Sequence, residues 1–393
     1  MKKFIEKFAW TVILLIAPVA GYITFHFQIQ PGVASDIPQH SDIIDSVING
    51  TYNVPHPMYH YIVFGLSKFL ELLHLPHSYN QAGILFLTFW MGVLAYTIFR
   101  ILCYYLSGSM SRIYISLLTV ALIFVTSFYP FAFNHNLYLG QWSPNIWHNP
   151  TMFMVKPFAF LAVFLFLYWE SNYNVNSYKL PVYLSVTTIF SLAAKPSFVF
   201  FFLPAIFVFL LIYIKKFNIS FYKMLVLSFL PAFCYLLLQY FSTYFLQNNG
   251  SPGLKDEIVF TLWGVTKLYT SHVFISLILA LAFPLFVVLS DLRGFSRDRS
   301  LIFAWLCTFF AYLQASFLAE QVKFTQGNFT FGYSLSLSIL FIFSVIHLFQ
   351  AWNKNKRTLV KKLINICGLM LLFGHLFSGV YYYYKYLLVG TYW

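Results

Sequence analysis

The chain has 393 residues, of which 60% are hydrophobic and 9% are charged, and its mean hydropathy is +0.73. This composition excludes an ordinary soluble domain and predicts an integral membrane protein. The formal net charge of +13 does not indicate nucleic-acid binding, because the basic residues do not interleave with aromatic rings in one patch. The 48 Phe and 29 Tyr are typical of lipid-facing surfaces and membrane interfaces instead.

Apolar runs of roughly 18 to 25 residues, long enough to cross a hydrocarbon core as helix, recur along the chain. About eleven transmembrane segments are predicted, at residues 9–27, 82–106, 113–132, 152–169, 180–194, 197–214, 223–245, 272–290, 300–319, 332–352 and 359–384. No polar stretch between them is long enough to fold by itself. We therefore expect an all-α polytopic protein with residues 1–393 in a single integral membrane domain.

The placement of the basic residues predicts the orientation. With the N-terminus in the cytoplasm, the inner loops are short and basic, and only seven of the 24 Lys and Arg residues lie outside. Those seven are Lys68, Lys156, Lys195, Lys255, Lys267, Lys323 and Lys385. The positive-inside rule then places the C-terminus and the long polar loops on the outer face. We expect a bacterial inner (plasma) membrane, with the first apolar segment retained as an anchor because no A-x-A cleavage site follows it.

The first outer loop, residues 30–61, gathers scarce ionisable groups. The whole chain has eleven carboxylates and eleven histidines, and this loop contains six of these residues. They are Asp36, His40, Asp42, Asp45, His56 and His60. Such a cluster in a membrane protein indicates chemistry or ion binding, although a solvated loop is the simpler alternative.

Within this loop, Asp36, His40 and Asp42 are the candidate catalytic residues. Asp36 is the first choice for a general base toward a hydroxyl group, and Asp42 is the second. The alternative is a helix N-cap formed by Ser35, Asp36 or Ser41.

Two short helices are predicted to bracket a polar pocket in the first outer region. The first surrounds residues 42–48 and stops at Asn49-Gly50. The second covers residues 58–76, where Lys68 and Glu71 make an interfacial position cheaper than a membrane-spanning one.

His56 and His60, in the segment PHPMYHY, are candidates for contacting a phosphate or another polar substrate. Together with Asp36 they also offer histidine and carboxylate ligands to a divalent metal. Their spacing does not match a zinc signature, so no cofactor is assigned and a divalent metal is left open.

Two lysine–proline steps stand near the predicted outer interface, at Lys156-Pro157 and Lys195-Pro196. A lysine near hydrocarbon usually has a partner, and a lipid headgroup or a phosphate is suitable. Snorkelling of the side chain to the interface is the alternative reading.

Two further outer segments are rich in amide, indole and imidazole groups, which suit sugar hydroxyls and rings. One is the turn with Glu320, Lys323 and Asn328, and the other is WSPNIWHNP at 142–150, with Asn145 and His148. Interfacial anchoring explains Trp142 equally well but explains the polar residues poorly.

The segments SDIPQH, PHPMYHYIVFGLSKFL, SYNQAGILFLTFW and SLAAKPSFVFFFLPAIFVFLL, taken in this order, resemble the GT-C membrane glycosyltransferases. The resemblance covers residues 1–215 as a catalytic core, with 216–393 as additional transmembrane helices. It departs from the family in lacking an adjacent Asp-Asp or Asp-Glu pair in SDIPQH, and no soluble C-terminal domain is present in the sequence.

The resemblance implies an inverting transfer of a sugar from a polyprenyl-phosphate donor lipid. The acceptor is a glycan, a lipid-linked oligosaccharide or a cell-envelope polymer on the outer face. Asp36 corresponds to the family's catalytic acid in the first loop and serves as base. Lys195, and less directly Lys156 or Lys323, correspond to the residues that hold the donor phosphate.

Three other functions remain as alternatives. A Wzy-type polysaccharide polymerase is expected to carry arginines in its outer loops, and none of the outer features above contains one. A transporter or lipid flippase is expected to show mid-span charges and repeat symmetry, for which His347 and His375 are the main candidates. An O-acyltransferase rests on a single intramembrane histidine.

Overall fold

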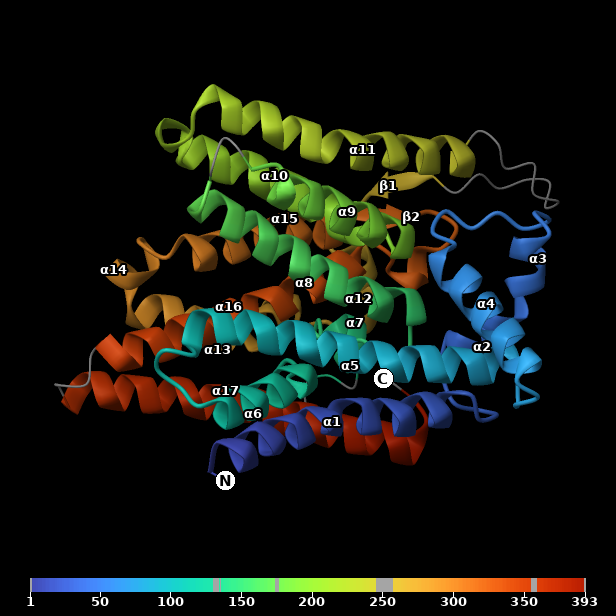
Figure 1. The fold of residues 1–393 in the computed structure, drawn as a ribbon, viewed down its shortest axis with the longest axis horizontal. Coiled ribbons are helices and arrows are strands. Elements are labelled where there is room, and N and C mark those ends of the chain that lie inside the picture. The colour runs from blue at the N-terminus through green and yellow to red at the C-terminus, as the bar shows by residue number, and fades with distance from the viewer. Residues whose placement is uncertain are drawn as a thin grey trace. The chain divides into compact units, whose positions relative to one another are not determined.

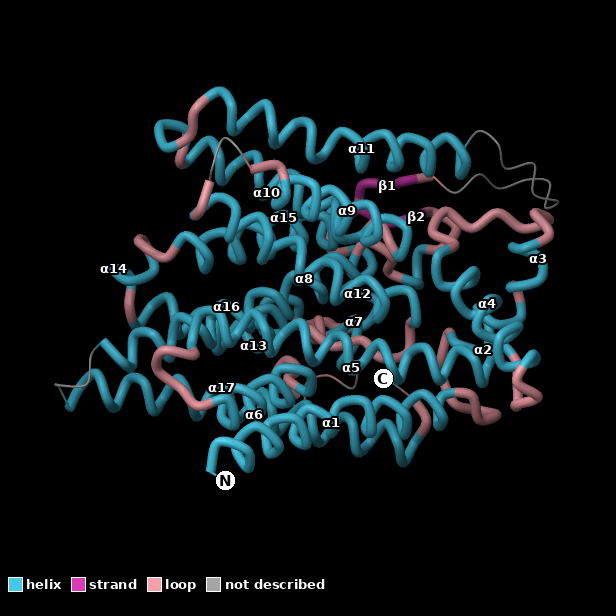
Figure 2. Tube along the Cα trace, in the orientation of Figure 1, coloured by secondary structure: helices cyan, strands magenta, loops and turns pink. Residues whose placement is uncertain are grey.

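The computed structural model describes residues 2–129, 134, 136–173, 177–244, 257–354 and 359–391. Most of these residues are helical (Figures 1 and 2), so the all-α prediction is confirmed. The exception is one short antiparallel ribbon of β1 (Ile258–Phe260) and β2 (Leu318–Glu320), which pairs Val259 with Ala319.

The helices follow the apolar segments of the sequence closely. Their bounds are α1 Lys2–Gln28, α2 Ile37–Asp42, α3 Ile44–Ile48, α4 Met58–Leu72, α5 Tyr79–Leu106, α6 Arg112–Phe124, α7 Leu137–Gly140, α8 Pro150–Ser171, α9 Lys179–Ala194, α10 Ser197–Ile212, α11 Ile219–Tyr244, α12 Gly264–Tyr269, α13 Val273–Ser290, α14 Leu292–Phe295, α15 Arg299–Phe317, α16 Thr330–Lys354 and α17 Leu359–Val389. Two single-turn 3₁₀ helices, η1 (Ile214–Lys216) and η2 (Phe324–Gln326), complete the described elements.

Eight helical segments of the described chain are long and apolar enough to cross a membrane. They contain α1, α5, α8, α11, α13, α15, α16 and α17. The other three predicted spans are apolar helices that fall short, namely α6, α9 and α10. The 16 residues of α9 extend about 24 Å, less than the roughly 30 Å of a hydrocarbon core. The predicted count of eleven spans is therefore not confirmed.

The predicted helices of the first loop are confirmed in type, with three where two were expected. The segment around residues 42–48 forms α2 and α3, and the segment after Pro57 forms α4. Helix α3 ends at Ile48 with Asn49 as its C-cap, and Gly50 follows with φ of +70°, a left-handed conformation that suits glycine. Lys68 and Glu71 of α4 form an exposed ion pair of 2.8 Å.

The chain divides into two compact units, each made from separated stretches of sequence. Unit 1 contains residues 1–20, 91–146 and 257–393, and unit 2 contains residues 21–90 and 147–256. Helices α1 and α5 contribute residues to both units. The prediction of one membrane domain with a core at 1–215 remains a prediction.

Unit 2 is built around α8, which is buried along most of its length. Helix α9 packs against α8, α10 and α11, and α4 packs against α8 and α9. At the C-terminal end of α8, the buried Glu170 accepts a hydrogen bond from Lys216 of η1 at 2.6 Å. Trp169 stacks on Phe221 of α11 beside this pair, with ring centroids 4.7 Å apart. These contacts fix the C-terminal end of α8 against η1 and α11.

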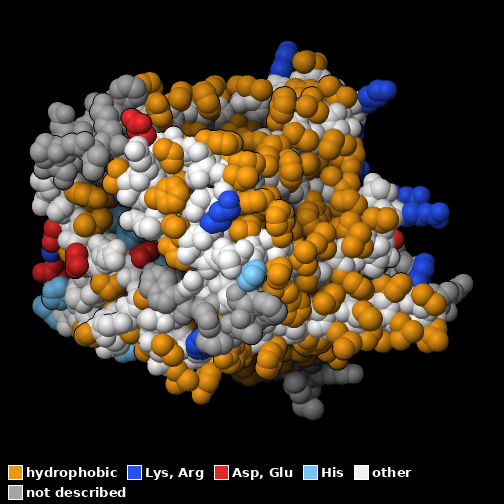
Figure 3. All heavy atoms as spheres, turned by 180° about the vertical axis from the view of Figure 1, so that it is seen from behind, with side chains coloured by type: hydrophobic (Ala, Val, Ile, Leu, Met, Phe, Trp, Pro, Cys, Tyr) orange, Lys and Arg blue, Asp and Glu red, His pale blue; other side chains and the backbone are white. Residues whose placement is uncertain are grey.

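Unit 1 has α16 at its centre, almost completely buried. Helices α13, α15 and α17 pack against it (Figure 1), and α6 contacts both α16 and α17. The side of α17 that points away from the rest of unit 1 exposes large apolar side chains, including Met370, Phe373 and Phe377. Apolar side chains also cover much of the helical surface in Figure 3, which suits contact with lipid.

Helix α6 ends at Phe124, although the sequence predicted a span over 113–132. Val125 is extended, the residues from 126 to 129 have no regular secondary structure, and the segment lies against α13 and α17. His375 of α17 donates from Nδ1 to the Thr126 carbonyl at 2.6 Å and accepts at Nε2 from the Phe283 amide at 3.3 Å. The Phe128 amide in turn donates to the Leu279 carbonyl at 3.3 Å. These bonds satisfy the backbone of this segment from outside, so the segment has no need to be helical.

Candidate functional site

Asp36 lies at the N-terminal end of α2, docked onto the loop that precedes α8. Its amide donates to the His148 carbonyl at 3.0 Å, and nearby Gln28 donates to the Trp147 carbonyl at 3.1 Å. Asp36 occupies the N-cap position, but its side chain makes no capping hydrogen bond. The Ile37 amide donates to the Ser35 hydroxyl instead, at 3.1 Å. The Asp36 carboxylate is thus turned away from its own helix toward the α8 loop.

Asn149 binds this carboxylate through a side-chain hydrogen bond. Its Nδ2 donates to Asp36 Oδ2 at 2.7 Å. Its Oδ1 caps α8 by accepting from the Met152 amide at 2.8 Å and from the Thr151 hydroxyl at 2.9 Å. Because a backbone amide can only donate, the cap fixes which end of the Asn149 side chain faces Asp36. Asn149 followed by Pro150 is a favoured sequence for a helix start.

Lys195 reaches the same amide from the break between α9 and α10. Its ammonium group lies 3.4 Å from both Asn149 Oδ1 and Thr151 Oγ1, and the side chain is 7% exposed. Lys195 is extended, with φ of −169° and ψ of 131°, because the following Pro196 disfavours helical backbone. One amide group therefore connects a carboxylate and an ammonium group from two distant parts of the sequence.

His40 and His60 form a second part of the site. His40 Nδ1 lies 3.1 Å from His60 Nε2, so one ring donates to the other. Burial lowers the pKa of His40 to about 3, and the nearby His60 and Lys195 lower it further. Burial lowers the pKa of His60 to about 4, with the Pro57 carbonyl opposing the shift. Both rings are consequently neutral at physiological pH.

Tyr59 packs against both histidines of this pair. Its ring packs edge-on against both His40 and His60, with centroids 5.8 Å and 5.7 Å away. It is fully buried over Gly83 of α5, where a Cβ atom would stand 2.7 Å from the Tyr59 hydroxyl oxygen. A side chain at position 83 would therefore clash with Tyr59 unless one of them moved.

His148 is influenced electrostatically by both charged groups of the site. Its side chain is buried, and this burial lowers its pKa to about 4. The Asp36 carboxylate raises this pKa and the Lys195 ammonium lowers it, so the ring is within electrostatic reach of both. We call Asp36, His40, His60, His148, Asn149, Thr151 and Lys195 the first-loop cluster.

Five residues predicted from the sequence thus come together in the first-loop cluster. They are Asp36, His40, His60, His148 and Lys195. Asp42 is exposed on α2. His56 is half-buried in the loop before α4, where Gln239 of α11 donates to the Pro55 carbonyl at 2.7 Å. Lys156 is buried on α8, two turns beyond Asn149.

The remaining predicted residues belong to unit 1. Asn145 is buried and donates to the Val125 carbonyl at 2.5 Å. Glu320 at the end of β2 accepts from Asn328 at 2.5 Å, and Lys323 between them is exposed. The predicted convergence of these residues with the first loop therefore remains a prediction.

Trp142 in unit 1 does not anchor the chain at an interface. It is 1% exposed and packs edge-on against Tyr312 and Tyr333. Its indole N–H donates to Thr266 at 3.3 Å. The ring is therefore part of the packed interior of this unit.

The donor atoms of the first-loop cluster face one another instead of a shared centre. His40 Nδ1 faces His60 Nε2, and Asp36 Oδ2 accepts from Asn149. Across the described residues, no group of three His, Cys, Asp or Glu side chains is arranged to hold a metal ion. The cluster is instead arranged to present one carboxylate and one ammonium group.

The sequence pointed to Asn149 only as one of the polar residues of the 142–150 segment, and it did not identify Thr151 or Tyr59 as site residues. The Asn149-Pro150 pair marks the start of α8, and this signal was available. Its contacts with Asp36 and Lys195 join residues 113 and 46 positions apart, which no local pattern reveals.

No protein-family model matches the chain, and a search of curated proteins gives no significant match. The class of protein supported by the structure is therefore a helical membrane protein with a polar cluster built on the first loop.

The histidines of the first-loop cluster predict a loss of stability in mild acid. Below about pH 6.5 the unfolded chain takes up protons at His40, His60 and His148, whereas the folded chain does not until about pH 4 or 3. The contribution of these histidines to the free energy of unfolding is therefore fully present above pH 6.5. It decreases as the pH falls, by at most about 1.4 kcal/mol per pH unit for each histidine. Thermal unfolding in detergent between pH 7 and 5, above the range in which carboxylates titrate, measures this slope.

The double variant His40→Gln and His60→Gln is expected to reduce this slope and to leave the contribution of His148. The neutral glutamines preserve polarity in the buried site but take up no protons. An unchanged slope in the double variant would show that the acid sensitivity arises elsewhere.

Proposed function

We propose that this protein is a membrane glycosyltransferase of the GT-C type. It transfers a sugar from a polyprenyl-phosphate-linked donor to a glycan or lipid-linked acceptor on the outer face of the membrane. The observation that supports this most strongly is the Asn149 side chain, which contacts Asp36 and Lys195 at once. Glycosyl transfer from a lipid phosphate needs a base and a cation at neighbouring positions.

In the proposed reaction, the Asp36 carboxylate accepts the proton of the acceptor hydroxyl. The acceptor oxygen attacks the anomeric carbon from the face opposite the phosphate, and the bond between that carbon and the phosphate oxygen breaks. Configuration at the carbon is inverted, and polyprenyl phosphate leaves. Lys195 offsets the charge that develops on the departing phosphate.

The surrounding residues support these two roles. Neutral His40 and His148 add no competing charge, and each can exchange hydrogen bonds with a sugar or phosphate. Asp36 is partly exposed, so an acceptor can reach it, whereas Lys195 is buried and held by the α8 cap. A charge held in a dry, fixed position stabilises a transition state more than a mobile surface charge does.

Transport is the alternative from a different class. Of its two intramembrane candidates, His375 uses both ring nitrogens for bonds to backbone groups, and His347 pairs through Nδ1 with Asp298. The apolar helices support membrane association under either function.

The test is transfer from radiolabelled polyprenyl-phosphate sugars, compared with nucleotide sugars, by the purified protein in lipid. Lys195→Gln is expected to lower kcat/KM for the lipid donor by about 10- to 100-fold, the value of charge-assisted hydrogen bonds to phosphate. Lys68→Gln removes an exposed ammonium group of α4 and serves as the matched control. Equal rates with Lys195→Gln and the wild type would contradict the assigned role.

A further inference from the structure

A second polar site lies in unit 1, apart from the first-loop cluster. A cavity of about 50 Å³ opens among α13, α16 and α17. Its wall combines polar side chains, including Asp291, His347 and Asn365, with apolar side chains such as Val287 and Leu348. This volume has room for a small group or a few waters.

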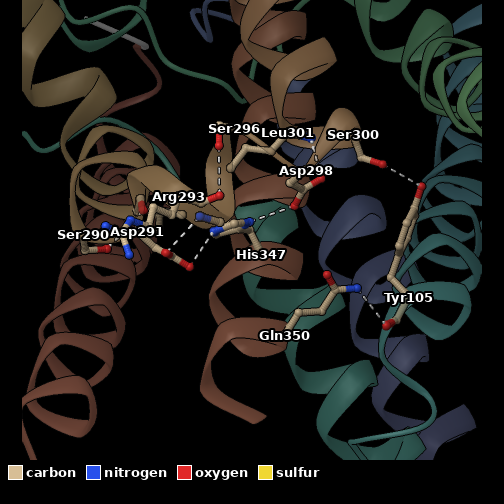
Figure 4. A network of polar contacts seen from close by, with 12 residues as sticks. Tyr105, Ser290, Asp291, Arg293, Ser296, Asp298, Ser300, Leu301, His347 and Gln350 are labelled. Carbon is tan, nitrogen blue, oxygen red and sulfur yellow. Dashed lines mark hydrogen bonds and ion pairs between the residues drawn. The ribbon is translucent and has the colours of Figure 1, made fainter. Parts of the chain in front are cut away.

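His347 is oriented by a carboxylate on the side away from the cavity. Its side chain is 7% exposed, and Nδ1 lies 2.8 Å from Asp298 Oδ2 (Figure 4). The other Asp298 oxygen caps α15 by accepting from the Leu301 amide at 3.1 Å, so this carboxylate is fixed. In the neutral ring, Nδ1 carries the proton and donates it to Asp298. The lone pair of Nε2 is then available.

Nε2 of His347 makes no hydrogen bond within the described part of the chain. The nearest carboxylate oxygen beyond it is Oδ2 of Asp291, at 3.7 Å (Figure 4). The other Asp291 oxygen accepts from the Gly294 amide at 3.0 Å, which fixes this side chain too. Two acceptors, Nε2 and Oδ2, therefore line one cavity, too far apart to bond to each other.

A single donor group can reach both acceptors at about 2.9 Å, an ordinary hydrogen-bond length. A primary ammonium group suits them best, because it has several N–H donors and a charge that complements Asp291. The apolar wall at Val287 and Leu348 suits the alkyl chain next to such a group. The described residues offer no set of three ligands for a metal.

We propose that the Asp291–His347 cavity binds the primary ammonium group of an aminoalkyl ligand. Lys361 also lines this cavity and is exposed. An ethanolamine phosphate headgroup of a membrane lipid carries such an ammonium group next to an anion, and a soluble amine carries the ammonium group alone. This site is independent of the proposed sugar transfer.

The first experiment measures binding of ethylammonium to the whole protein by thermal shift, at pH 8 and constant ionic strength. Tetramethylammonium, which has the charge but no N–H donor, is the reference cation. Stabilisation by ethylammonium alone is expected, weakened about tenfold in apparent affinity by Asp291→Asn and by His347→Gln. Asparagine is a good N-cap, so the start of α14 is preserved in the first variant.

Glu71→Gln removes an exposed carboxylate of α4 and is expected to bind ethylammonium as the wild type does. Native mass spectrometry from nanodiscs of mixed phosphatidylethanolamine and phosphatidylcholine shows whether the ammonium group comes from a lipid or from a soluble amine. Selective retention of the ethanolamine lipid, lost in Asp291→Asn, assigns the site to lipid, and ethylammonium binding without lipid selection assigns it to a soluble amine.

Three results would overturn the proposal. They are an equal effect of both cations, equal ethylammonium binding by Asp291→Asn, and stabilisation by Mn²⁺ or by acid in place of ethylammonium.

Discussion

Replacing Asp36 by asparagine is expected to lower the rate of sugar transfer by about 10²- to 10⁴-fold, the contribution of a general base. Asparagine has nearly the same shape, and its side-chain oxygen can still accept from Asn149 Nδ2. The fold is therefore expected to persist while the negative charge is lost. The measurement is kcat with a polyprenyl-phosphate donor, together with thermal unfolding of the same sample.

Asp42→Asn is the matched comparison, because it removes a carboxylate from the same short helix. Asp42 is exposed, so this change is expected to alter kcat by less than about twofold. A large loss with Asp42→Asn and none with Asp36→Asn would move the role of the base to Asp42. Equal, small losses in both variants would remove the first loop from the chemistry.

Helix type and position were largely predictable, because apolar runs in this chain are long and interrupted by strong signals. Pro196 after Lys195 predicted the break between α9 and α10, and Asn49-Gly50 predicted the end of α3. Helix length was less predictable. Residues 125–129 fall inside a predicted span, yet they are not helical because His375 and Leu279 supply their backbone partners.

The charged and histidine members of the first-loop cluster were predictable, but its connections were not. Scarce ionisable residues in one loop pointed to Asp36, His40 and His60, and the lysine–proline break pointed to Lys195. Nothing local indicates that Asn149 joins Asp36 to Lys195, since this depends on how α8 and α9 pack. Asn145 and His148 look equivalent in sequence, but one donates to a carbonyl in unit 1 and the other lies in the cluster.

Gly379→Ala, which adds only a methyl group, is expected to lower the free energy of unfolding strongly. Gly379 lies on the face of α17 that meets the end of α6, and a Cβ atom there would overlap the Phe124 carbonyl oxygen and stand 3.2 Å from the Thr126 amide nitrogen. Both neighbours are backbone atoms, which cannot rotate away as a side chain can. Small residues allow such close approach between membrane helices.

The expected destabilisation comes from the hydrogen bonds that the segment after α6 makes with α17. To make room for a methyl group, residues 124–126 must move from α17, which stretches the Thr126 bonds to the His375 carbonyl and ring. Overpacking costs about 1–3 kcal/mol, and each weakened buried hydrogen bond adds about 1 kcal/mol. A total of about 3–5 kcal/mol is expected, seen as a lower unfolding temperature and poor recovery of monodisperse protein in detergent.

Gly65→Ala separates this steric effect from the general properties of glycine. Gly65 is an exposed residue within α4, and a Cβ atom there has no neighbour within 4 Å. Alanine favours helix by about 1 kcal/mol over glycine, so this variant is expected to be as stable as the wild type or slightly more so. If Gly379→Ala behaved like Gly65→Ala, the end of α6 would not lie directly against α17. The non-helical backbone at 125–129 would then lose the partners that account for its conformation.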